Sequence, residues 1–78
     1  MITYYKLYTL LKRKDMTLAD LRKISGITTN ATVAINNGEL VHLKVINAIC
    51  KALNCQPGEI LDYEDDAINS NKVWKYQK

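Results

Sequence analysis

The stretch from Thr17 to Gly38 constrains the fold of this chain more than any other part of its sequence. It reads TLADLRKISGITTNATVAINNG, which predicts a short helix, a turn marked by Gly26 and a second helix that stops at Asn37. This spacing is typical of a helix-turn-helix, a unit that lays its second helix in the major groove of DNA. The remaining residues must therefore supply the helices that support this unit.

The first helix of this unit carries signals at both of its ends. Thr17 is the expected N-cap, and Asp20 follows three residues later as an approximate capping box. Gly26 is expected to end the helix, because a left-handed C-cap costs glycine least. The apolar residues expected to face the core are Leu18, Leu21 and Ile24.

The second helix is expected from about Thr29 to Asn37, with Thr28 as its N-cap. Ile27 is expected to point from the turn into the core. The residues expected to face inward are Thr32 and Ile35, with Ala31 beside them. The residues expected to face outward are Thr29, Asn30, Val33 and Asn36.

Three further helices are expected around this unit, and no strand is predicted within the domain. One covers about residues 4–14, with Leu7, Leu10 and Leu11 at helical spacing. Another covers about residues 42–53, and its apolar stripe is Leu43, Ile46, Ile49, Cys50 and Leu53. A short fifth helix opens at Gln56-Pro57, followed by Ile60 and Leu61 as core residues. We therefore predict an all-α, five-helix domain over residues 1–63 and a C-terminal tail over 64–78.

The charge is uneven along the chain. The formal net charge is +3, made up of +5 in residues 1–58 (eight Lys/Arg against three Asp/Glu) and −2 in residues 59–78 (three against five). The basic part coincides with the helix-turn-helix and the helix before it, and a basic body attracts polyanions. Ordinary solubilising charge is the alternative reading of this balance.

Several classes of function are disfavoured by what the sequence lacks. Cys50 and Cys55 have no zinc-ligand spacing, and free thiols are expected in preference to a disulfide. His42, the sole histidine, is expected on the surface as a helix cap or phosphate contact. No catalytic constellation, signal peptide or membrane-spanning run is present in the sequence. We therefore expect a cytoplasmic protein that is not an enzyme and that has no cofactor, metal or small-molecule substrate.

Two segments together resemble a known family. LYTLLKRKDMTLADLRKISGIT and NNGELVHLKVINAICKALNCQPGEILD are similar to the Cro and phage-repressor type, or XRE-like, helix-turn-helix proteins, and to their small single-domain bacterial branch. The resemblance covers about residues 2–63 and implies a lambda-repressor-like fold. It also implies a transcriptional regulator, a repressor in our reading, that binds operator DNA as a homodimer. Two departures are Thr32, where a larger aliphatic residue is usual, and Arg22, where the broad family prefers a small one.

The resemblance also assigns candidate DNA contacts. The positions that match the family's base-reading residues are Thr29, Asn30, Val33 and Ala34. Asn30 has the donor and acceptor pair that fits adenine, and Val33 offers an apolar contact for a thymine methyl. Thr28 and Asn37 match positions that often touch phosphate.

The expected recognition helix contains no Lys or Arg, so its affinity for the DNA backbone must come from elsewhere. Candidate cations for phosphate contacts are Arg22, Lys23 and Lys44, together with the amides at helix N-termini. For Arg22, an ion pair with a carboxylate is an equally open alternative.

Two questions stay open from the sequence. In the tail, Val73, Trp74 and Tyr76 alternate with lysines, which fits a strand pairing with another chain, an arm folded over the N-terminal tyrosines, or a disordered segment. The alternative function is a protein-interaction module, an antitoxin or adaptor, on the same fold. This alternative is supported by the absence of charge on the second helix and by the outward position of Val33.

Overall fold

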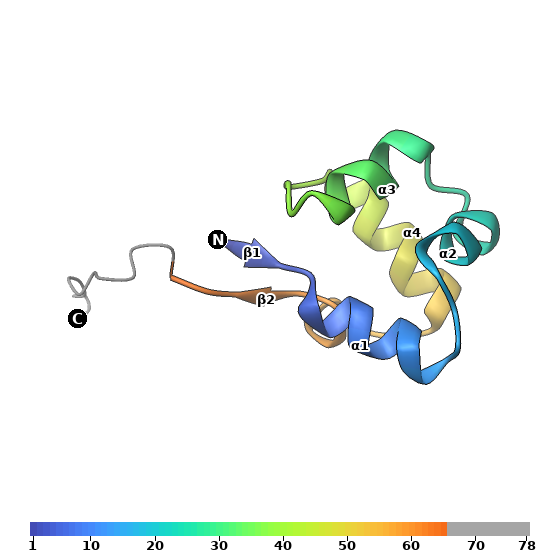
Figure 1. The fold of residues 1–78 in the computed structure, drawn as a ribbon, viewed down its shortest axis with the longest axis horizontal. Helices are drawn as coiled ribbons and strands as arrows, with labels where there is room; N and C mark the ends of the chain where they lie inside the picture. The colour runs from blue at the N-terminus through green and yellow to red at the C-terminus, as the bar shows by residue number, and fades with distance from the viewer. Residues whose placement is uncertain (66–78) are drawn as a thin grey trace.

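A computed structural model describes residues 1–65 of the chain (Figure 1). Within these residues, four α-helices are followed by a short 3-10 turn and flanked by two short strands. The elements are β1 (Ile2–Thr3), α1 (Tyr5–Arg13), α2 (Leu18–Ser25), α3 (Thr29–Asn36), α4 (Leu43–Leu53), η1 (Pro57–Glu59) and β2 (Asp62–Tyr63). The part of the tail that raised the three alternatives, residues 67–78, lies outside the described residues.

The prediction of an all-α domain is confirmed, but the count of five helices is wrong. The expected fifth helix is the three-residue 3-10 turn η1, with Pro57 at its start as predicted. The Glu59 carboxylate accepts a hydrogen bond from the Gln56 N–H at 3.0 Å, which closes the turn on itself. Ile60 then enters the core completely, and the chain leaves in an extended conformation towards β2. The turn ends after three residues, because the poorer hydrogen-bond geometry of a 3-10 helix makes longer runs uncommon.

The two-stranded sheet is the element that the sequence analysis did not expect. β1 and β2 pair antiparallel, with Ile2 opposite Tyr63 and Thr3 opposite Asp62. Two-residue strands are too short to show an alternating pattern, which explains the omission. The pairing joins the two ends of the described chain and projects from one end of the helical body (Figure 1).

The hydrophobic core draws residues from every helix. α4 crosses behind α2 and α3 and packs against both α2 and η1 (Figure 1). Ile27 is buried in the turn between α2 and α3, as predicted. The buried residues are Tyr4, Leu7, Leu11, Leu21, Ile27, Ala31, Ile35, Ile46, Ile49, Leu53 and Ile60.

Two residues expected in the core are exposed. Ile24 is 55% exposed. It lies about 60° around the helix from the buried Leu21, on the opposite side of Leu21 from the half-buried Ser25, so its side chain is turned away from the core. Leu43 is 81% exposed, because it is the first residue of α4 and lies one turn before the buried Ile46. The core therefore begins later on α4 and is narrower on α2 than the apolar pattern indicates.

Candidate nucleic-acid interface

The start of α2 is fixed by a complete capping box. The Asp20 N–H donates to Thr17 Oγ1 at 3.2 Å, and the Thr17 N–H donates to the Asp20 carboxylate at 3.0 Å. The hydrogen bonds from the Thr17 backbone and side chain lower the pKa of Asp20 below its ordinary value. The capping interpretation of this pair from sequence is confirmed.

The turn between α2 and α3 is held by two successive caps. Gly26 ends α2 with φ of +79°, and its N–H donates to the Arg22 carbonyl at 3.0 Å. Thr28 then caps α3, because its Oγ1 accepts from the Ala31 N–H at 3.1 Å. Open space surrounds the position of a Cβ on Gly26, so its left-handed backbone is what favours glycine there. These caps set the angle at which α3 leaves α2.

α3 has one buried face and one exposed face. Ala31 and Ile35 are buried and attach the helix to the core. Thr29 and Asn30 are exposed, and Val33 is 51% exposed. Ala34, the fourth expected base-reading residue, is half-buried. The structure therefore brings three of the four residues together on one accessible surface.

Thr32 occupies a boundary position instead of the expected inward one. Its side chain is half-buried, and its Oγ1 donates to the Thr29 carbonyl at 2.7 Å. The hydroxyl is thus satisfied within α3, so a threonine is tolerated beside the core. The smaller Ala31 takes the buried place next to Ile35.

The candidate phosphate contacts lie at both ends of α3, on α2 and on α4. Thr28, Asn37, Lys23 and Lys44 are exposed, whereas Arg22 is half-buried. The guanidinium of Arg22 forms no ion pair with any residue in 1–65. The carboxylate partner considered for Arg22 is therefore absent from the described part of the chain.

A hollow of about 530 Å³ lies between the end of α2 and one side of α4. It is lined by Ile24, Ser25, Lys44 and Lys51, among others. Lys51 was not among the expected phosphate contacts, although its spacing of seven residues from Lys44 places both on the same side of a helix. Lys51 therefore adds a second cation beside Lys44, and the exposed Ile24 lies next to both.

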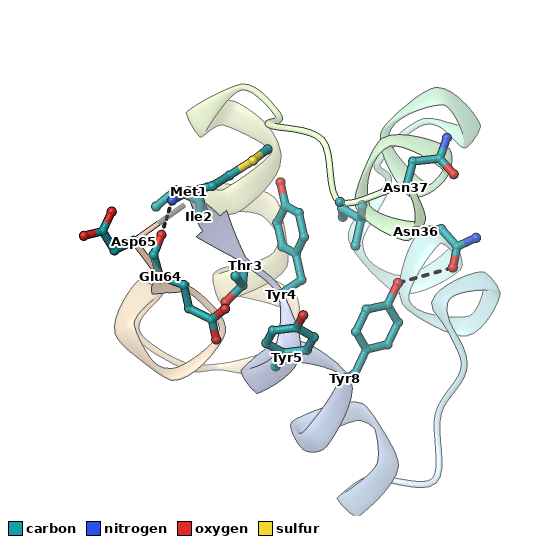
Figure 2. A pocket seen from close by; sticks show the side chains of 12 residues that line it. Met1, Ile2, Thr3, Tyr4, Tyr5, Tyr8, Asn36, Asn37, Glu64 and Asp65 are labelled. Carbon is teal, nitrogen blue, oxygen red and sulfur yellow. Dashed lines mark hydrogen bonds between the residues drawn. The ribbon is translucent and has the colours of Figure 1, made fainter. Parts of the chain in front are cut away.

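Two tyrosines connect the N-terminal part of the chain to α3 and the loop after it, and Figure 2 shows the contact of Tyr8 with Asn36. Tyr8 Oη donates to Asn36 Oδ1 at 3.4 Å, and Tyr4 Oη donates to the Glu39 carbonyl at 2.5 Å. Burial raises the pKa of both tyrosines above its ordinary value. No pattern in the sequence predicted that these tyrosines position α3.

The other candidate groups make no site in the described residues. His42 lies at the N-cap of α4, but its side chain makes no capping hydrogen bond. Cys50 and Cys55 are free, half-buried thiols. Residues 1–65 contain no cluster of three or more His, Cys, Asp or Glu able to hold a metal ion. No helix in this part of the chain is long and apolar enough to cross a bilayer.

A capped helix-turn-helix that presents the outer face of its second helix defines the class of helix-turn-helix DNA-binding domains. The family model described as "Cro/C1-type HTH DNA-binding domain" matches residues 6–66. The chain therefore belongs to the Cro/C1-type HTH DNA-binding domain family.

Two relatives place the chain among transcriptional regulators. It is 39% identical over 70 residues to YozG of Bacillus subtilis (strain 168), an uncharacterized HTH-type transcriptional regulator, with 87% of this chain and 83% of that protein covered. It is also similar to the crystal structure of the transcriptional regulator VanUg, with 36% identity and a TM-score of 0.75 over 78% of this chain and 81% of that one. The resemblance seen in the sequence is thus confirmed, and the chain is a DNA-binding domain of the regulator type.

Proposed function

We propose that this protein binds specific double-stranded DNA sequences by placing α3 in the major groove and that it acts as a transcriptional repressor. The observation that carries the proposal is the accessible surface of Thr29, Asn30 and Val33 on a helix held from behind by Ala31 and Ile35. A rigidly attached helix with polar and small apolar side chains outward suits direct readout of base edges.

Each residue of this surface has a chemical counterpart on DNA. The Asn30 side-chain N–H can donate to N7 of adenine while its side-chain oxygen accepts from N6–H of the same base, which makes adenine its preferred base. The exposed Val33 side chain suits a thymine methyl group, and Thr29 suits either a base edge or a phosphate. Ala34 contributes a methyl contact from its half-buried position.

Backbone affinity comes from groups around α3, because α3 itself carries no Lys or Arg. We assign phosphate contacts to residues at both ends of α3, on α2 and on α4: Thr28, Asn37, Arg22, Lys23 and Lys44. The amides in the first turns of α2 and α3 add partial positive charge.

We further propose that the protein binds as a homodimer. One α3 presents few base-reading side chains, so two copies reading two half-sites about 34 Å apart would provide the specificity of an operator. A dimer bound across a promoter would repress by excluding the transcription machinery from that DNA. Light scattering that finds a monomer both free and bound to DNA would contradict the homodimer.

The readout face is tested by Asn30→Ala with Asn47→Ala as the matched control. Both asparagines are exposed, but Asn47 lies on α4. The wild type should bind the preferred duplex more tightly than a duplex in which the contacted base is changed. Asn30→Ala should reduce this difference in binding free energy by about 1–3 kcal/mol. Anisotropy titrations on both duplexes and on non-specific DNA measure this loss. Equal discrimination by Asn30→Ala and the wild type would contradict the proposed face.

The phosphate contacts are tested by Lys44→Ala with Lys6→Ala as the matched control. Lys6 carries the same charge, but its Nζ donates to the Gly58 carbonyl at 3.1 Å, beside η1 and away from α3. Loss of one phosphate contact should reduce the slope of log K against log salt by roughly 0.9 for Lys44→Ala alone. Equal slopes for the two variants would remove Lys44 from the contact set.

The protein-interaction module remains the second candidate. The exposed Val33 on a helix without cations is the observation that favours it, because such a surface also suits a protein partner. A failure of the protein to prefer any DNA sequence, with intact folding, would support this candidate over the proposed regulator.

A further inference from the structure

A groove of about 550 Å³ lies between β1, the start of α1 and the end of α3 (Figure 2). Ile2, Tyr5 and Tyr8 form much of its apolar lining, and Ile35 lies at its base. Figure 2 shows the rings of Tyr4 and Tyr5 beside β1, with the ring of Tyr8 next to them on the side towards Asn36. It therefore offers an aromatic surface at the point where the two ends of the described chain meet.

One edge of the sheet also faces this groove. Met1 and Glu64 exchange backbone hydrogen bonds across the strands, with the Glu64 N–H to the Met1 carbonyl at 2.9 Å. In an antiparallel pair, the next residue then directs its N–H and C=O away from the partner strand, and that residue is Ile2. The sheet has two strands within residues 1–65, so this edge of β1 is open to a further strand.

The described chain ends at the rim of the same groove. Glu64 and Asp65 are both part of its lining. Seven residues, 66–72, separate Asp65 from Val73 and can span roughly 23 Å when extended. A segment tethered this closely has an effective concentration on the order of millimolar, which favours it over an occupant from solution.

The sequence beyond Asp65 matches the groove in pattern and in charge. Trp74 and Tyr76 are two residues apart, so they share one face of an extended segment while Lys75 lies on the other. The segment after Asp66 carries three lysines and no acidic residue. The rim carries two carboxylates, of Glu64 and Asp65, against one ammonium, the N-terminus of Met1. The C-terminal end of α3, whose last turn has no basic residue, also lies at the rim.

We propose that the chain's own segment Val73–Tyr76 binds in this groove as a third strand along β1, with the Trp74 ring against Tyr5 and Tyr8. Because the groove borders Asn36 and Asn37, the bound segment supports the end of α3. It leaves Thr29, Asn30 and Val33 uncovered, since none of them lines the groove. This inference does not depend on DNA binding.

Trp74 is the sole tryptophan, so intrinsic fluorescence of the full chain reports directly on this contact. Relative to the urea-unfolded protein, native Trp74 should emit at shorter wavelength and resist quenching by acrylamide. Tyr5→Ser should raise the ratio of unbound to bound segment about fivefold through the loss of an aromatic pair. Tyr63→Ser is the matched control, because Tyr63 is 64% exposed against 66% for Tyr5 but lies outside the groove.

Three results would overturn the proposal. The first is native emission and quenching equal to those of the unfolded chain. The second is an equal response of Tyr5→Ser and Tyr63→Ser, which would place Trp74 elsewhere. The third is a dependence of the Trp74 signal on protein concentration, which would assign the groove to the segment of a second copy. A protected signal that is constant on dilution and sensitive to Tyr5→Ser supports the proposal.

Discussion

The helix-turn-helix and the β1–β2 sheet differ in how the sequence specifies them. In the first, caps and a glycine lie within a few residues of the backbone groups they satisfy, as Thr17 does for Asp20. In the second, β1 pairs with residues about sixty positions away, without a local pattern. The region that defines the class of protein is therefore locally encoded, whereas the arrangement of the chain ends depends on the completed core.

The two regions also differ in burial. Leu21 in α2 and Ile35 in α3 are almost completely buried, whereas both residues of β2 are exposed. Burial of apolar surface dominates stability, so the helices should carry most of it. The following changes test this difference, from the largest expected effect to the smallest.

The largest effect is expected from Leu21→Ala. Leu21 is 0% exposed, so its truncation should lower the free energy of unfolding by about 2–5 kcal/mol. Tyr63→Ala on β2 should change it by less than about 0.5 kcal/mol. Urea denaturation monitored by circular dichroism measures both. Equal losses from the two variants would show that the sheet is as central to stability as the helices.

A smaller effect is expected from Thr17→Ala. Removing this cap should cost about 1 kcal/mol, because the Asp20 N–H loses its acceptor. Thr9→Ala is a matched control, since Thr9 Oγ1 donates to the Tyr5 carbonyl within α1 and caps nothing. Thermal unfolding of the two variants should differ accordingly. If Thr9→Ala proves as costly, the local capping account of α2 is wrong.

The carboxylate in the same capping box should make stability depend on pH. The pKa of Asp20 is lower in the folded state than its ordinary value of 3.8, so the folded protein favours the charged form. Its contribution is fully present above the unfolded-state pKa and is lost as the pH falls through the lower folded-state pKa. Asp20→Asn should remove this part of the acid dependence in unfolding curves measured at several pH values. An unchanged pH profile would contradict the capping role.

The smallest effect is expected in the sheet. Thr3 Oγ1 is buried without a hydrogen-bond partner in the described structure. Thr3→Val replaces this hydroxyl with a methyl group of similar size and should stabilise the protein by roughly 0.5 kcal/mol. Chemical denaturation is sensitive enough to detect the gain. A clear loss of stability would mean that the hydroxyl has a partner in solution.

The limits of the sequence analysis follow from the same comparison. The caps Thr17 and Thr28 and the turn at Gly26 were predictable, because each acts on its own neighbours. The exposure of Ile24 and Leu43 was not, because helical spacing indicates a face but not how far the core extends along it.

The candidate DNA contacts divide in a similar way. The outward direction of Asn30 and Val33 followed from the period of α3 and agrees with their exposure. The contact of Tyr8 with Asn36 joins α1 to α3 across the fold, and no local pattern predicts such a pair. The spacing of Lys51 from Lys44 could have predicted that both lie on one side of a helix. That they line the same hollow as Ile24 could not be predicted, because this hollow forms only when α2 packs against α4.

The central claim is that the exposed face of α3 reads a DNA sequence. Selection of binding sites from random duplex DNA by the full chain, at a stated salt concentration, tests it most directly. The account predicts enrichment of one motif with two half-sites about 34 Å apart, and loss of base preference within each half-site for Asn30→Ala. Failure of the folded wild-type protein to enrich any motif would contradict the account.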